Sequence, residues 1–260
     1  MTPTERFAHL VAGPESELRL DEAALLIAAH AHPHLDPAAE LARLDELARG
    51  LPAGDLAALQ QRLFAEAGFR GNEADYYDPE NSYLDTVLER RTGIPITLSV
   101  VTLEVARRSG TELVGIGMPG HFLVGTTEAT PRYLDPFNAG CSLDAAGCAA
   151  RFAAISGGQR LDPAALRPVG PRAILARMLA NLTGIARRRH DVGLLQWVLE
   201  LRAAVPDQSL AERRDLAAGL AGAGRFDEAA EVLERLAVDL PTAAAEEARR
   251  AALTLRARLN

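Results

Sequence analysis

The chain has 260 residues, of which 48% are hydrophobic and 24% are charged, as in an ordinary globular protein. Its formal net charge is −7, so it has no general excess of positive charge for a nucleic-acid backbone, and we expect no nucleic-acid partner. No stretch approaches the roughly 18 uninterrupted apolar residues of a membrane helix, and the first residues lack a signal-peptide pattern. We therefore expect a cytoplasmic protein that does not enter the membrane.

The beginning of the chain is predicted to be helical. Apolar residues recur at helical spacing in three stretches between Pro14 and Gly68, and prolines separate these stretches. After Gly68 the sequence becomes polar and aromatic. This change places a predicted boundary after a helical N-terminal region, residues 1–68.

The middle of the chain changes from helical to strand periodicity. Asn81 or Ser82 is expected to cap a helix that begins at Tyr83, and a second helix is expected from Pro95 to about Gly110. Three short strands are predicted after it, at residues 113–118, 122–126 and 132–137. Helices followed by strands predict an α+β fold.

The last part of the chain, residues 169–260, returns to helical spacing and contains a repeat. Pro206 and Pro241 are 35 residues apart, and residues 224–230 resemble the turn between the helices of a tetratricopeptide repeat. Such repeats stack and leave a concave face that commonly holds a peptide. Arg187 and Arg214 could hold an acidic peptide on that face, while ordinary helix capping and solvation remain the alternative.

Three motifs in the middle region point to one family. They are the stretch from Asn81 to Ser99, the Pro-Gly-His-Phe sequence at residues 119–122 and the Asp-Pro-Phe sequence at residues 135–137. Together they closely resemble the SirB-type branch of the transglutaminase-like superfamily, whose members also carry C-terminal tetratricopeptide repeats. The resemblance implies a papain-like core, a helix with an antiparallel sheet, which we place at residues 69–168.

The resemblance also implies where a catalytic site would lie. Catalytic members of the superfamily use a cysteine at a helix N-terminus, a histidine on the next strand and an aspartate that orients the histidine. Here His121 and Asp135 match the last two positions. Counting back from Gly110 places the nucleophile near Pro95 to Thr97, where the chain has no cysteine. Its cysteines come later, at 141 and 148, and we interpret them as inert, reduced residues.

Two functional hypotheses follow. The favoured one is a non-catalytic protein-interaction or regulatory module that recruits a protein or peptide. The alternative is a hydrolase or acyltransferase acting on amide or ester bonds, with Thr97 or Ser99 as nucleophile and with His121 and Asp135 as base and orienting group. A purely structural role for the pair also stays open.

No cofactor and no metal are expected. His30 and His34 would share one helix face with room for a zinc ion, but the proline between them interrupts that helix, so a solvated helix end is the preferred interpretation. The sequence does not indicate an oligomeric state.

Overall fold

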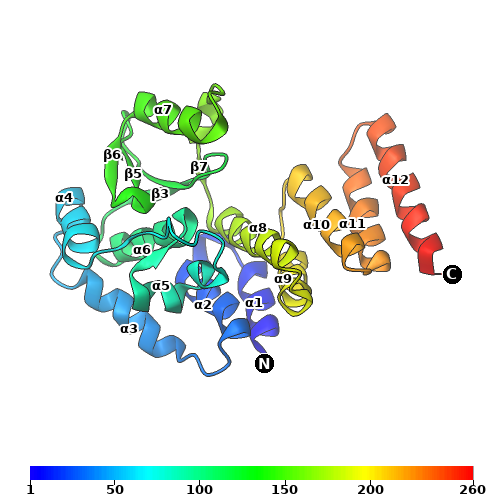
Figure 1. The fold of residues 1–260 in the computed structure, drawn as a ribbon, viewed down its shortest axis with the longest axis horizontal. Helices are drawn as coiled ribbons and strands as arrows, with labels where there is room; N and C mark the ends of the chain where they lie inside the picture. The colour runs from blue at the N-terminus through cyan, green and yellow to red at the C-terminus, as the bar shows by residue number, and fades with distance from the viewer. Residues whose placement is uncertain (260) are drawn as a thin grey trace. The chain divides into compact units, whose positions relative to one another are not determined.

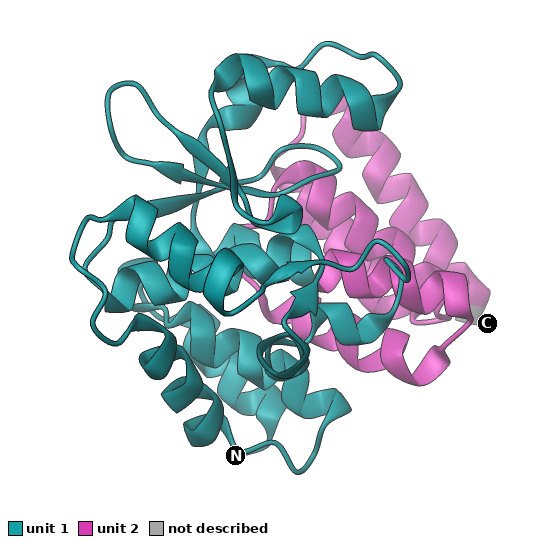
Figure 2. Cartoon of the chain, turned by 60° about the vertical axis from the view of Figure 1, so that its left-hand side comes forward, with its two compact units in different colours: residues 1–178 teal, residues 179–260 magenta. Residues whose placement is uncertain are grey.

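A computed structural model describes residues 1–259, and the chain divides into two compact units, residues 1–178 and 179–260 (Figures 1 and 2). The N-terminal helices and the sheet both belong to the first unit. The division into regions at 68/69 and 168/169 remains a prediction. No helix within residues 1–259 combines the length and the apolar character needed to cross a membrane.

Unit 1 begins with helices, and one of them, α6 (Pro95–Arg108), packs against one face of a sheet. The helices are α1 (Pro3–Ala12), α2 (Leu20–Ala31), α3 (Pro37–Ala48), α4 (Leu56–Gln60), α5 (Leu84–Arg90), α6 (Pro95–Arg108) and α7 (Ala145–Ser156). Helix α6 begins with proline at its first position, as predicted, because a missing N–H costs nothing there. Helices α2, α3 and α5 pack against it. Helix α1 lies before the three predicted helical stretches and begins with a capping box between Thr2 and Glu5.

The sheet has five antiparallel strands in the order β6-β5-β4-β3-β7. The strands are β3 (Leu113–Ile116), β4 (Leu123–Thr126), β5 (Tyr133–Asp135), β6 (Cys141–Leu143) and β7 (Pro168–Val169). Helix α6 packs against β3 and β4, and α7 covers the opposite face, where Cys148 and Phe152 join a buried cluster with Ile116 (Figure 1). A separate parallel pair consists of β1 (Arg70–Gly71) and β2 (Thr92–Gly93). The predicted α+β class is confirmed in this mostly helical form.

The expected cap of the helix near residue 83 was wrong. Helix α5 begins at Leu84, and its N-cap residue Tyr83 makes no side-chain capping bond. Asn81 lies in a 3₁₀ turn, Pro79–Ser82, and its amide donates to the carbonyl of Asp75 at 2.7 Å. The side chain that could have capped the helix instead holds the preceding loop.

Unit 2 consists of helices that pack in chain order. After α8 (Pro171–Arg189), which spans the division, come α9 (Val192–Ala204), α10 (Leu210–Gly222), α11 (Phe226–Val238) and α12 (Thr242–Arg256). Leu199, Leu216 and Leu220 form the centre of a buried cluster shared by α9, α10 and α11. Helices α9 and α11 begin 34 residues apart, which is close to the spacing read from the sequence.

Candidate functional site

His121 and Asp135 lie at the ends of neighbouring strands and are hydrogen-bonded. His121 lies two residues before the start of β4, and Asp135 is the last residue of β5, which pairs with β4. The imidazole Nε2 lies 2.8 Å from Asp135 Oδ1, and both residues are buried. Because an ionised carboxylate can only accept, Nε2 carries a proton, and in the neutral ring Nδ1 is then the acceptor nitrogen. Nδ1 has no hydrogen-bond partner in the described part of the chain.

Asp135 is held in its ionised form by several donors. Asn138 donates its amide to Oδ2 at 2.7 Å, and the Nε of Arg151 lies 3.3 Å from the same oxygen. Burial alone would raise the pKa of Asp135. The hydrogen bonds from His121 and Asn138, together with the charge of Arg151, outweigh burial and lower the pKa. The carboxylate therefore stays charged and fixes the orientation of the imidazole.

The turn that carries His121 is held by Arg177, which lies on α8 within unit 1. Its Nη2 donates to the carbonyls of Met118 and His121, at 2.7 and 2.8 Å. Burial lowers the pKa of this guanidinium. Sequence reasoning missed Arg177, because no local motif links a residue on α8 to a turn more than fifty residues earlier.

Aromatic rings connect the buried imidazole to the surface. The rings of His121 and Phe137 are 6.0 Å apart and nearly perpendicular, and the ring of Tyr76 lies 5.9 Å from that of Phe137. Tyr76 is partly exposed. A pocket of about 500 Å³ adjoins this row of rings, lined by Phe137 and Asn138 together with Arg70. Such a surface offers large, rigid contact area for a ligand.

The two candidate hydroxyls lie in α6, and neither is hydrogen-bonded to the imidazole. Ser99 Oγ donates to the carbonyl of Pro95 at 2.8 Å, within its own helix. Thr97 Oγ1 is buried and has no hydrogen-bond partner among residues 1–259. The structure thus joins His121 to Asp135 but does not join either hydroxyl to that pair.

Neither cysteine is hydrogen-bonded to the imidazole within the described residues. Cys141 begins β6 opposite Asp135, and its Sγ lies 3.8 Å from Nη2 of Arg151. Cys148 is fully buried in α7, and burial raises the pKa of its thiol to about 11. A nucleophilic cysteine needs a lowered pKa, so Cys148 has the opposite character.

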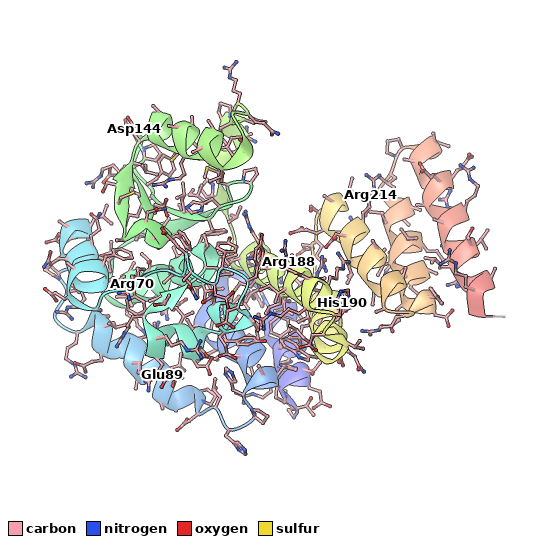
Figure 3. All side chains as sticks on the ribbon, viewed as in Figure 1. Arg70, Glu89, Asp144, Arg188, His190 and Arg214 are labelled. Carbon is pink, nitrogen blue, oxygen red and sulfur yellow. The ribbon has the colours of Figure 1, made fainter. Side chains whose placement is uncertain are left out.

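The remaining candidates lie elsewhere. In unit 2, Arg187 Nη1 is 3.5 Å from Asp215 Oδ1, next to Arg214, which is exposed and makes no ion pair within the described residues (Figure 3). In unit 1, Nδ1 of His30 bonds to its own helix at the carbonyl of Leu26. His32 is bonded to Asp85 on another helix at 2.5 Å. These histidines therefore do not converge.

A helix packed on an antiparallel sheet, with a histidine just before one strand hydrogen-bonded to an aspartate at the end of the next, defines an α+β core with a paired histidine and aspartate. A family model described as the transglutaminase-like superfamily matches residues 27–180. This chain belongs to that superfamily.

Several curated proteins are similar to parts of this chain. A UPF0162 protein of Xylella fastidiosa strain Temecula1 is 44% identical over 135 residues, covering 50% of this chain and 48% of that protein. A UPF0162 protein of Pseudomonas aeruginosa is 36% identical over 172 residues, 63% of each chain. F-box only protein 21 of Mus musculus is 35% identical over 166 residues, covering 59% of this chain and 26% of that protein. This chain thus matches only part of each relative's length, and no solved structure matches it.

Proposed function

We propose that this chain is a non-catalytic, cytoplasmic transglutaminase-like protein of the SirB type that acts as a protein-interaction or regulatory module. The observation that carries the proposal is the environment of His121. Helix α6 begins with Pro95, and no thiol or hydroxyl in residues 1–259 is hydrogen-bonded to the imidazole. Without an activated nucleophile the remaining pair can orient side chains but has no group to form a covalent intermediate.

Two surfaces suit a peptide. The row of aromatic rings beside His121 supplies rigid apolar area in unit 1. In unit 2 the helix pairs and their 34-residue spacing support the proposal of tetratricopeptide-type repeats. There Arg214 makes no ion pair within residues 1–259, and Arg187 pairs with Asp215 at 3.5 Å, so we propose that the two bind an acidic peptide.

Affinity capture from a cell lysate tests the proposal. The protein is compared with a double variant, Arg187→Ala with Arg214→Ala, and with the control Arg249→Ala, an exposed arginine on α12 of the same unit. We expect the unmodified protein and the control to recover the same partner and the double variant to lose it. Equal recovery by all three proteins, or no recovery above background, would reject the proposal.

A second candidate function rests on Thr97. Its hydroxyl is buried and unpartnered, and the Nδ1 of His121 is unpartnered as well, so a local rearrangement could bring them together as nucleophile and base. A hydroxyl-directed fluorophosphonate probe tests this alternative. Labelling that disappears in both Thr97→Ala and His121→Ala would establish the enzyme and end the non-catalytic proposal. The parallel variant Ser99→Ala tests the other hydroxyl.

A further inference from the structure

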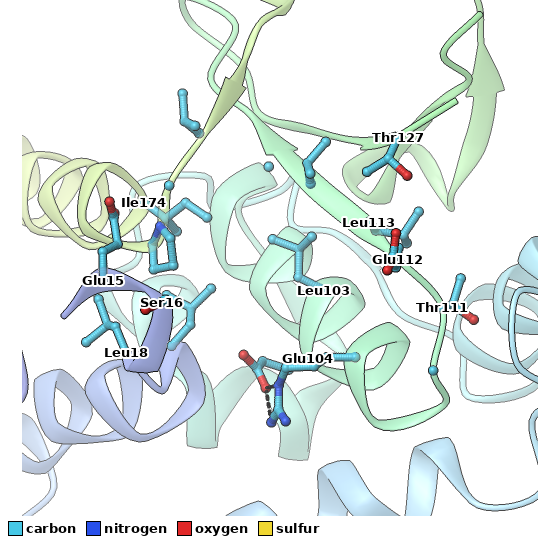
Figure 4. A pocket seen from close by; sticks show the side chains of 18 residues that line it. Glu15, Ser16, Leu18, Leu103, Glu104, Thr111, Glu112, Leu113, Thr127 and Ile174 are labelled. Carbon is cyan, nitrogen blue, oxygen red and sulfur yellow. Dashed lines mark hydrogen bonds and ion pairs between the residues drawn. The ribbon is translucent and has the colours of Figure 1, made fainter. Parts of the chain in front are cut away.

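A large pocket lies at the C-terminal end of α6, away from His121. Its volume is about 800 Å³, within the range of about 300 to 1,000 Å³ that is typical of ligand sites (Figure 4). All the residues that line it belong to unit 1. Its apolar lining includes Leu18, Leu20, Leu103, Leu113, Val169 and Ile174.

One side of the pocket is the uncovered edge of β3. Strand β7 pairs only with Gly115 and Ile116, and then ends at Val169. Pro168 has no N–H, so its pair with Ile116 is not hydrogen-bonded, and Gly115 carries the bonds to β7. By strand alternation, the N–H and C=O of Leu113 point to the same edge, beyond the end of β7. No residue of β7 pairs with Leu113, so these two groups can pair with an added strand.

The side chains of β3 show where an added strand would place its own. Ile116 and Val114 belong to the cluster covered by α7. Leu113 and Gly115 therefore face the other way, and a methyl group on Gly115 would come within 2.9 Å of Ile174 Cδ1. Alternate side chains of a strand paired with Leu113 would thus enter the apolar pocket.

Among the described residues, the charged side chains that line the pocket without an ion pair are carboxylates. Arg107 lies on the floor and is occupied, because its Nε and Nη2 donate to Glu104 at 2.9 and 2.7 Å and its Nη2 also reaches Asp21. Glu112 is exposed and makes no ion pair in the described chain. Glu15 accepts one backbone N–H, that of Arg172, at 3.0 Å. A ligand with positive charge complements this rim.

We propose that this pocket binds an extended peptide that adds a short strand to the free edge of β3 and carries basic side chains beside apolar ones. Main-chain hydrogen bonds to Leu113 supply its alignment, the apolar pocket takes alternate side chains, and the carboxylates of Glu15 and Glu112 select for arginine or lysine. All the lining residues of this site belong to unit 1, and neither His121 nor Asp135 is among them. Its failure would leave the function proposed above untouched.

The probe is the peptide acetyl-Arg-Leu-Val-Leu-Arg-amide, titrated into the ¹⁵N-labelled full-length protein and followed by amide chemical shifts. We expect progressive shifts of Leu113, Gly115, Val169 and Gly170. A peptide concentration of about 5 mM would largely fill a site with a dissociation constant of about 1 mM. Absence of shifts at these amides at that concentration would overturn the proposal.

Two N-methylated peptides distinguish strand addition from simple apolar binding. One carries N-methyl groups on both leucines, and the other carries them on the central valine and both arginines, so each peptide keeps the N–H groups of only one edge of its strand. Because one edge pairs with β3, one peptide should bind about tenfold more weakly and the other should bind normally. Equal affinities of the two peptides would overturn the strand-addition proposal.

The charge preference is tested with Glu112→Gln. We expect this variant to bind the arginine peptide about threefold more weakly at low salt and to bind a peptide with glutamines in place of the arginines normally. Glu89→Gln, an exposed carboxylate on α5, is the matched control and should change neither affinity. An unchanged affinity of Glu112→Gln for the arginine peptide would refute the basic preference.

Discussion

At the scale of single residues, Asp135 is the most constrained group of the site. It is fully buried, and its two oxygens receive donors from His121, Asn138 and Arg151. Asp135→Asn keeps the shape but removes the charge and turns one acceptor into a donor that faces other donors. We expect the free energy of unfolding at neutral pH to fall by about 2–4 kcal/mol, measured by urea titration. The exposed control Glu73→Gln should change it by about 0.5 kcal/mol or less.

The same carboxylate predicts a pH dependence. Its pKa in the folded protein lies below the ordinary value of 3.8, so the unfolded chain takes up this proton first as the pH falls. The stabilisation is therefore complete above pH 3.8 and is lost as the pH falls through the lower, folded pKa. The stability difference between wild type and Asp135→Asn should shrink when urea titrations are repeated near pH 3, within the stated window. A difference that stays constant would contradict this account.

The two thiols should differ in reactivity. Cys148 is fully buried and its pKa is raised to about 11, whereas Cys141 is partly exposed. Alkylation with iodoacetamide at mildly alkaline pH should therefore modify Cys141 first, and Cys148 should react only after unfolding, because the thiolate is the nucleophile. Mass spectrometry of the labelled peptides measures the order. Fast labelling that persists in Cys141→Ala would show that Cys148 is accessible in the native state.

At the scale of secondary-structure elements, a buried ion network joins α2 to α6. Asp21 is fully buried and bonded to Arg108 at 2.6 Å, and Glu104 is bonded to the same guanidinium at 2.7 Å. Burial would raise both pKa values. At Asp21 the hydrogen bonds from Arg108 and Arg19 outweigh it and lower the pKa, while at Glu104 burial and the charge of Asp21 prevail and raise the pKa.

These opposite pKa shifts predict that neutralising the two carboxylates has unequal effects on stability. Asp21→Asn should lower the free energy of unfolding by about 3–5 kcal/mol, because it leaves Arg108 partly uncompensated. Glu104→Gln removes a charge that the fold disfavours, so it should cost less than about 1 kcal/mol or stabilise the protein. Urea titration at neutral pH compares the two variants. If both variants lost the same free energy of unfolding, the proposed difference between the two carboxylates would be wrong.

The elements that could be predicted from the sequence are those with their own local signals. Helix α6 has a proline at its start, and β3, β4 and β5 were predicted within a few residues of their observed bounds. Strand β7 has two residues and exists only because Gly115 and Ile116 pair with it, so no local pattern could have revealed it. Helix α7 was missed although Asp144 is a good cap, with its Oδ1 2.7 Å from the N–H of Gly147.

The site was predictable only in part. His121 and Asp135 came from a family resemblance, and their hydrogen bond is observed, while their role stays a proposal. Arg151 and Arg177 were not foreseen, because their partners are distant in the chain and arginine has no motif there. Local sequence specifies strand ends and turns, whereas the donors that surround a carboxylate depend on how helices pack.

At the scale of the whole molecule, each unit has its own buried cluster and its own spectroscopic or chemical probe. The only tryptophan, Trp197, lies on α9 in unit 2, and Cys148 lies in the core of unit 1. Leu220 is fully buried among α9, α10 and α11, and Leu134 is fully buried in β5. Two such clusters in one chain favour unfolding in more than one step.

We therefore expect Leu220→Ala and Leu134→Ala to act on different transitions. Each removes a buried side chain and should cost about 2–5 kcal/mol in its own unit. Leu220→Ala should move the urea midpoint of Trp197 fluorescence and leave that of Cys148 labelling nearly unchanged, while Leu134→Ala should do the reverse. In a chain that unfolds as one cooperative unit, a loss of stability in either cluster lowers the midpoint of both probes. Equal shifts of the Trp197 and Cys148 midpoints in both variants would therefore show that the two units unfold together.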